Sequence, residues 1–293
     1  MFRMFASAAL LCACELLSAP AQAASDYTVP FPAHHVAGNV YFVGTKGQAN
    51  YLITTPQGNI LVNSGLIETL PLTKASIAKL GFKYSDTKIV LISHAHFDHD
   101  AASAQVVKET GAKYDVMDAD VPVVESGGKT DFQYGDKGKE NLYPAIKVDR
   151  TLHDGDTVSL GGTVLTAHKT PGHTKGCTTW TLKVKDGGKT LDVVIVGSPN
   201  VNAGYVLVGN KKYPGIAQDF EKTFAALKAL PVDVFLGAHG DYYGMPAKYA
   251  KLKPGSANPF IDPAGYKAYI ADRETAFRTE LARQKSGLPP KTK

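Results

Sequence analysis

Short apolar, β-branched runs alternate with Gly, Pro and Asn along most of the chain, and this pattern predicts strands rather than long helices. Two of the runs, KIVLIS and VDVFL, are predominantly apolar without a regular alternation, which is typical of strands buried on both faces. The predicted strands cover residues 39–44, 50–55, 59–63, 88–93, 113–117, 157–167, 178–184, 191–197 and 232–236.

Four segments instead have apolar residues at helical spacing: residues 70–80, 101–110, 216–230 and 263–284. Gly111 directly follows the second of them, as expected of a helix end. Residues 121–141 are rich in Gly, Lys and Asp, and predict loops with a short helix near the functional site. Strands and helices occur in two similar halves without a long linker, so we expect one domain with sheets inside and helices outside.

Composition agrees with a globular enzyme or binding protein. The chain has 293 residues, of which 44% are hydrophobic and 20% are charged, enough for a sizeable core. The net charge of +5 is not concentrated in any run of Lys and Arg. This indicates a mildly basic surface and argues against a nucleic-acid partner.

The first 23 residues have the features of a bacterial signal peptide. Arg3 supplies a positive start, an apolar run follows, and Ala21-Gln22-Ala23 has the small-x-small pattern of a cleavage site. Glu15 interrupts the apolar run, which is shorter than the roughly 20 residues of a membrane span. We therefore expect cleavage after Ala23, a single mature domain over residues 24–293, and a periplasmic or secreted protein. Lipid anchoring at Cys14 is the alternative.

Candidate metal ligands are most concentrated in the run His94-Ala95-His96-Phe97-Asp98-His99, directly after the KIVLIS strand. His94 and His96 are two residues apart, so they can point the same way from an extended segment. Asp98 and His99 follow as the chain turns toward a helix and can face a second point nearby. Imidazole and carboxylate without thiolate are typical of a hydrolytic zinc site rather than a closed structural one.

Two more histidines occupy comparable positions beside strands. His173 lies in the turn Thr170-Pro171-Gly172-His173-Thr174, and His239 follows the VDVFL strand. Active sites gather on such loops, so both are candidate ligands. The remaining histidines of the mature chain have no such setting, and we expect structural or surface roles for them: His34, His35, His153 and His168.

The run His94-x-His96-x-Asp98-His99, the PGHT turn and the late strand-end histidine together resemble the metallo-β-lactamase superfamily over nearly the whole mature chain. The resemblance is strongest to the third subclass of class B β-lactamases. It implies an α/β fold, a four-layered αβ/βα sandwich of two mixed β-sheets with helices on the outer faces. It also implies two zinc ions, the first on His94, His96 and His173 and the second on Asp98, His99 and His239.

The segment around Gly197-Ser198 distinguishes the branches of the superfamily from one another. Glyoxalase-like and lactonase-like members usually have a metal-bridging Asp there, and the first β-lactamase subclass uses a cysteine ligand. Neither ligand type stands at Ser198. The neighbouring stretch resembles one that contacts substrate in the third subclass, which makes Ser198, Asn202 and Tyr205 candidate substrate contacts.

The chain departs from the family pattern at two positions. Asn63 stands where the superfamily usually has an Asp that supports the metal site, and an amide lacks the charge that raises ligand basicity. Cys177, the only cysteine outside the predicted signal peptide, replaces a serine beside the site. We do not count it as a ligand.

The resemblance implies a zinc hydrolase that opens the β-lactam ring of antibiotics and so gives resistance, and we expect it to be a monomer. The resemblance implies attack by a zinc-activated hydroxide, with Asp98 as the catalytic residue that orients it. We expect a small-molecule β-lactam as the substrate, and neither a nucleic acid nor a stable membrane span. Two alternatives remain: an exported hydrolase of the same fold acting on a lactone or thioester, and a zinc-binding periplasmic protein without catalysis.

Overall fold

The computed structural model describes residues 26–292. The predicted signal peptide, its cleavage site and Cys14 lie outside these residues. Within the part that is described, no helix is both long and apolar enough to cross a membrane.

The first half of the chain forms a seven-stranded sheet in the order β1-β2-β3-β4-β5-β6-β7. The strands up to β4 pair antiparallel, and β4 through β7 pair parallel. Their bounds are His34–Ala37 (β1), Val40–Phe42 (β2), Tyr51–Thr55 (β3), Gly58–Val62 (β4), Thr87–Leu91 (β5), Lys113–Met117 (β6) and Arg150–Leu152 (β7).

The second half forms a five-stranded sheet in the order β12-β11-β10-β9-β8. It is antiparallel except that β12 pairs parallel with β11. The bounds are Thr157–Leu160 (β8), Thr163–Lys169 (β9), Thr178–Asp186 (β10), Lys189–Val196 (β11) and Val234–Gly237 (β12).

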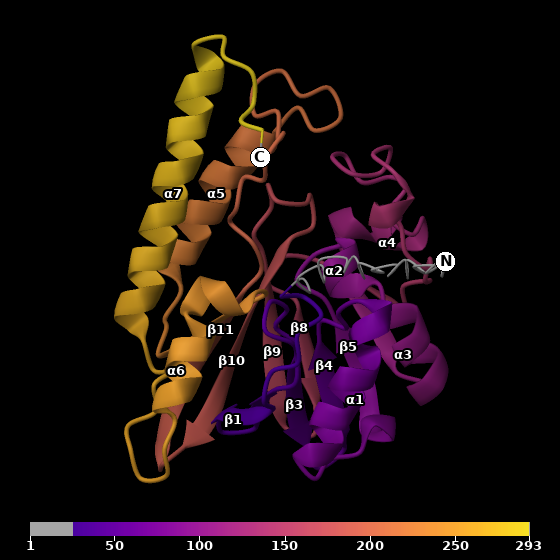
Figure 1. Cartoon of the computed structure of the whole chain (residues 1–293), viewed down its shortest axis with the longest axis vertical. Coiled ribbons are helices and arrows are strands. Elements are labelled where there is room, and N and C mark those ends of the chain that lie inside the picture. Colours follow the sequence, from indigo (N-terminus) through magenta and orange to yellow (C-terminus); the bar gives the residue numbers. More distant parts are fainter. Residues whose placement is uncertain (1–25, 293) are drawn as a thin grey trace, which may run out of the picture.

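Helices cover the outer face of each sheet (Figure 1). The α-helices are Leu70–Lys79 (α1), Phe97–Asp100 (α2), Ser103–Thr110 (α3), Val121–Glu125 (α4), Ile216–Ala229 (α5), Met245–Lys251 (α6) and Pro263–Lys285 (α7). The 3-10 helices are Ile67–Thr69 (η1), Tyr84–Asp86 (η2), Asp118–Asp120 (η3), Lys139–Asn141 (η4) and Gly240–Tyr243 (η5). With α1 and α3 on one side and α5 and α7 on the other, the predicted αβ/βα sandwich of two mixed sheets is confirmed.

Two hydrophobic clusters hold these layers together. The larger joins inward-facing residues of both sheets with α5 and α7, and includes Phe42, Trp180 and Phe220. The smaller lies between the first sheet and the helices α1 and α3, and includes Leu61 and Val106. Each sheet is therefore apolar on both faces, which explains why central strands such as β5 read as continuous apolar runs.

The predicted strand over residues 157–167 is wrong in one respect, because it is a hairpin of two strands, β8 and β9. The chain turns at Gly161 and Gly162, whose φ angles are +52° and +88°. Two adjacent residues with positive φ form the tight turn that joins twisted antiparallel strands, and the Gly-Gly pair is its signal. The strands β1 and β7 were not predicted, because they are only four and three residues long.

His34 lies in an aromatic cluster, stacked between Phe42 and Phe260 with its Nδ1 bonded to the Pro32 carbonyl at 2.8 Å. Burial lowers its pKa to about 4, although the bond to Pro32 opposes the shift. Because the folded-state pKa lies below the ordinary value, the stability contribution is complete above about pH 6.5 and is lost as the pH falls toward 4.

We expect His34→Leu to reduce the acid sensitivity of folding. Protonation of His34 lowers the free energy of unfolding of the wild type by about 2 kcal/mol between pH 7 and pH 5. The measurement is urea unfolding of metal-free wild type and variant at both pH values, with His35→Leu as the exposed control. Equal pH dependence in wild type and His34→Leu would contradict this expectation.

Candidate metal centre

Three separate segments bring the predicted metal-binding side chains together. His94 and His96 follow β5, and Asp98 and His99 lie on α2. His173 lies in the loop between β9 and β10, and His239 follows β12. Each of these segments directly follows a strand, so the two sheets fix the positions at which the loops begin.

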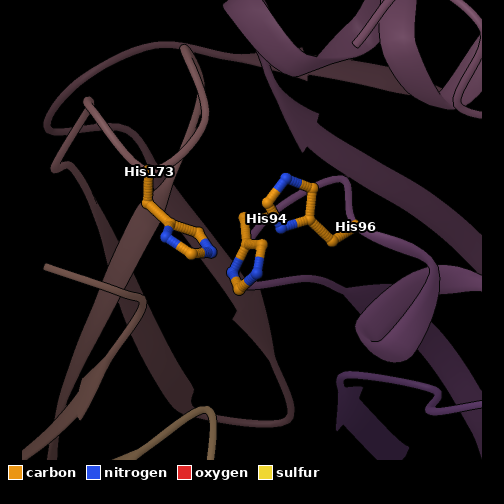
Figure 2. Close-up of side chains that lie close together, drawn as sticks. All are labelled: His94, His96 and His173. Atoms are coloured by element: carbon orange, nitrogen blue, oxygen red, sulfur yellow. The ribbon is translucent and has the colours of Figure 1, made fainter. Parts of the chain in front are cut away.

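His94, His96 and His173 form the first group. One nitrogen from each ring lies within 4.8 Å of the others, so together they could hold a metal ion. Figure 2 shows the three rings facing a common space, His94 and His96 from the first half of the chain and His173 from the second. All three side chains are buried, with 1%, 6% and 4% of their surface exposed. The site therefore excludes bulk water from most of each ligand.

Asp98, His99 and His239 form a second, tighter group. The Nε2 atoms of His99 and His239 are 3.0 Å apart. Asp98 Oδ2 lies 3.2 Å from the first and 3.5 Å from the second. Ligand atoms on a tetrahedral ion with 2.0–2.1 Å bonds stand about 3.3 Å apart, so this triangle has the dimensions of one face of such a site.

The other ring nitrogens orient the imidazoles. Nδ1 of His173 bonds to the Asn200 carbonyl at 2.8 Å, and Nδ1 of His239 bonds to the Gly47 carbonyl at 2.9 Å. A carbonyl only accepts, so both Nδ1 atoms carry the proton and each Nε2 presents a lone pair in the neutral ring. The Nε2 lone pair of His239 and the carboxylate of Asp98 converge on the Nε2 atom of His99, so the group presents the nitrogen and oxygen donors that a cation takes. The second group therefore fits a metal ion.

The electrostatics favour the metal-binding forms of four of these side chains. Burial, and then the neighbouring histidines, lower the pKa of His94 and of His173. Burial and His99 likewise lower the pKa of His239. Burial opposes ionisation of Asp98, but His99 and His239 together hold its pKa below the usual range. Neutral imidazoles and an ionised carboxylate are the forms that bind metal.

The comparisons with known proteins agree with this site. Residues 38–239 match the model of the metallo-beta-lactamase superfamily. The chain belongs to this superfamily. A metal-dependent hydrolase of Thermodesulfovibrio yellowstonii is 26% identical over 251 residues, covering 82% of this chain and 84% of that protein. Our protein is accordingly a metal-dependent hydrolase of the superfamily.

Two solved structures are more similar. The FEZ-1 metallo-beta-lactamase from Legionella gormanii is 53% identical, with a TM-score of 0.86 over 88% of this chain and 98% of that one. BJP-1, a subclass B3 metallo-beta-lactamase of Bradyrhizobium japonicum, is 42% identical, with a TM-score of 0.84 over 89% and 98%. These neighbours agree with the resemblance to the third subclass seen in the sequence.

In this member of the superfamily, all the side chains of the two metal groups except His99 line a cleft of about 870 Å³. Tyr27 stacks on the His239 ring with 5.6 Å between the ring centroids. Besides the metal groups and Tyr27, the lining includes Lys46, Phe97, Tyr134, Asn141, Asn200, Asn202, Gly204, Asp241 and Tyr242. The loop over residues 121–141 thus contributes to the site through Tyr134 and Asn141.

The three candidate substrate contacts lie at different depths. Asn202 lines the cleft, and its amide donates to the Tyr134 hydroxyl at 3.0 Å. Ser198 is buried, and its hydroxyl is 3.1 Å from that of Tyr242, which does line the cleft. Tyr205 is also buried, and its hydroxyl donates to the His173 carbonyl at 2.7 Å. Tyr205 therefore holds the loop that carries His173.

The two departures from the family pattern have local explanations. The Asn63 amide accepts from the Ser93 backbone N–H at 2.8 Å and donates to the Ala49 carbonyl at 3.2 Å. A carboxylate could accept the first bond but could not donate the second. Cys177 is a buried thiol that accepts from the Ser198 N–H at 3.2 Å, and burial raises its pKa to about 12. It does not belong to either metal group.

Sequence reasoning missed two buried carboxylates near the site. Asp131 Oδ2 lies 3.7 Å from His96 Nε2, and the Asp131 carboxylate raises the pKa of His96 against the effect of burial. Asp120 accepts hydrogen bonds from the loops that carry the histidines. Both lie in or beside the segment of weak periodicity, and a lone Asp in a loop has no spacing signal to identify it.

Proposed function

We propose that the protein is a zinc hydrolase that opens the β-lactam ring of antibiotics and thereby gives resistance. The observation that carries the proposal is the donor set. Six imidazole and carboxylate side chains lie close together beside one cleft, and a serine stands at position 198 where other branches supply a further ligand. The similarity to two structures that are themselves metallo-beta-lactamases supports it.

Two zinc ions per chain would be held, the first by His94, His96 and His173 and the second by Asp98, His99 and His239. Nitrogen and carboxylate donors without thiolate are typical of catalytic zinc. When bound, zinc supplies a water that loses its proton near neutral pH and a Lewis acid that polarises a carbonyl. No serine nucleophile is then required.

The chain's own groups supply positioning and proton handling. Asp98 is the catalytic residue in this proposal, because its ionised carboxylate lies beside His99 and His239 and can accept a hydrogen bond from the proton of an attacking water, which orients that water. Asn202 would contact the polar substituents of the substrate from the cleft wall. Ser198 would act through the Tyr242 hydroxyl, and Tyr205 by holding the His173 loop.

We also propose that the protein acts outside the cytoplasm. Removal of the predicted signal peptide would deliver a monomeric mature domain to the bacterial periplasm or the medium. β-Lactams act outside the cytoplasm, so an exported enzyme would meet its substrate before the antibiotic meets its target.

The test is an assay of the purified protein, residues 24–293, with a penicillin, a cephalosporin and a carbapenem while bound zinc is measured by atomic emission. We expect turnover of at least one of them, loss of turnover with a chelator, and recovery on adding zinc. Full zinc occupancy without turnover of any of the three would overturn the proposal. Turnover of a lactone or thioester by the same sample would then identify the alternative hydrolase.

A further inference from the structure

Asp120 is a buried carboxylate outside both metal groups that connects the loops carrying the first one. It ends η3, directly after β6, and only 1% of its surface is exposed. Its Oδ2 accepts from the Ala95 N–H at 3.0 Å and from the Thr174 hydroxyl at 2.7 Å. Its Oδ1 accepts from the Gly176 N–H at 2.8 Å.

The three donors belong to the two loops that supply the first metal group. Ala95 lies between His94 and His96, and Thr174 directly follows His173. One carboxylate therefore joins the backbone of the first loop to the side chain and backbone of the second. Burial raises the pKa of the Asp120 carboxyl, and the three donors oppose that shift by stabilising the carboxylate, which accepts all three bonds and so connects the two loops.

The surrounding packing leaves Asp120 little freedom. A Cβ at Gly176 would lie 2.5 Å from the Asp120 backbone nitrogen and 2.7 Å from its Cβ, so the loop can approach this closely only at a glycine. The Ala95 peptide is also held from its other side, because the Tyr143 hydroxyl donates to the Ala95 carbonyl at 2.8 Å. Ala95, between His94 and His96, is thus bonded at both its N–H and its C=O.

We propose that Asp120 is a positioning residue for the first metal group: it sets the separation of the His94–His96 loop from the His173 loop and so determines metal affinity there. This rests on the proposed metal site, but not on the identity of the substrate. Asp120 makes no contact with Asp98, His99 or His239 among the hydrogen bonds and ion pairs of the described residues. Its effect on the second group should therefore be small.

Asp120→Asn tests the proposal with little change in volume. The amide nitrogen must face either the Gly176 N–H or the Ala95 N–H, so one donor meets another whichever way the amide turns. The loops keep other connections, since Thr178 N–H bonds to the Ser93 carbonyl at 2.7 Å and the Trp180 indole bonds to the Ile92 carbonyl at 3.0 Å. The variant is therefore expected to fold.

The measurement is competitive titration of metal-free protein with Zn²⁺ against a chromophoric chelator, which reads affinity without any assay of turnover. We expect Asp120→Asn to weaken one site by about 10–100-fold, the usual effect of removing a group that orients metal ligands, and to leave the other within about threefold. The substitution His239→Ala removes one ligand of the second group and leaves the first group intact. When Asp120→Asn is added to this variant, the zinc affinity of the first group should fall by the same factor.

Asp118→Asn is the matched control. It lies on the same 3-10 helix, but its carboxylate contacts Lys169 at 2.6 Å, His153 at 3.4 Å and the Ala119 N–H, and none of these residues is a donor to Asp120 or a member of a metal group. Both affinities should equal those of the wild type. If Asp120→Asn fails to fold, Thr174→Val is the second variant, because it removes one of the three donors to Asp120. It should also weaken zinc binding by the first group. Thr174→Ser keeps the hydroxyl and should keep the wild-type affinity.

Unchanged zinc affinity in Asp120→Asn, or an equal loss at both sites, overturns the positioning role. Absence of β-lactam turnover in a wild type that binds zinc would overturn the proposed function instead, and would leave this titration as informative as before.

Discussion

Asp98→Asn is expected to lower kcat/KM for a β-lactam by roughly 10²–10⁴-fold, the range for loss of a positioned proton-handling group. The substitution keeps the shape of the side chain but removes its charge. Asp98 Oδ2 lies 3.2 Å from His99 Nε2 and 3.5 Å from His239 Nε2, so an amide there offers the second group either a weaker oxygen ligand or an N–H that repels a cation.

The assay should be run with saturating zinc and with the bound metal counted, so that lost chemistry is separated from lost metal. Asp26→Asn is the matched control, because Asp26 lines the same cleft but pairs with Lys46 at 2.9 Å rather than with the metal groups. Wild-type kcat/KM in fully metallated Asp98→Asn would remove Asp98 from its catalytic role.

Trp180→Ala is expected to lower the free energy of unfolding by about 3–5 kcal/mol, the cost of emptying a large buried site. Trp180 lies on β10 in the core between the sheets, with 1% of its surface exposed. Its indole N–H donates to the Ile92 carbonyl, two residues before His94, so the alanine also leaves a buried acceptor without its partner.

Urea unfolding followed by circular dichroism measures this loss, because Trp180 is the only tryptophan and its removal abolishes the fluorescence signal. Trp180→Phe retains most of the buried ring but not the N–H, and should cost clearly less than the alanine. If Trp180→Ala unfolds at the wild-type urea concentration, the side chain is not a main contributor to the core between the sheets.

The fold could be predicted well from the sequence where local patterns are strong. The predicted helix over residues 70–80 appears as α1, Leu70–Lys79, and the segment 263–284 as α7, Pro263–Lys285. Predictions failed where an element is short or where a turn was overlooked. The β8–β9 hairpin is the clear case, because its Gly161-Gly162 turn lies inside an otherwise strand-like run.

The residues of the candidate metal centre could likewise be predicted only in part from the sequence. His94, His96, Asp98 and His99 could be identified because four candidate ligands lie within six residues at a strand end. His173 and His239 are single residues that their place beside strands made candidates, and the family pattern assigned them to the metal groups. Asp120 and Tyr143, which hold the Ala95 peptide, were not identified, because their partner lies 25 and 48 residues away along the chain.

The sequence by itself determined the periodicity of the strands and helices and the chemical types of the metal-binding side chains, because these depend on neighbours within one or two turns of chain. Only the tertiary structure decided which loops meet. The His239 ring is oriented by the Gly47 carbonyl, 192 residues away, and His173 by the Asn200 carbonyl on a third segment. Those bonds exist because the two sheets pack face to face and place their loops around one cleft, and no local pattern encodes that distance.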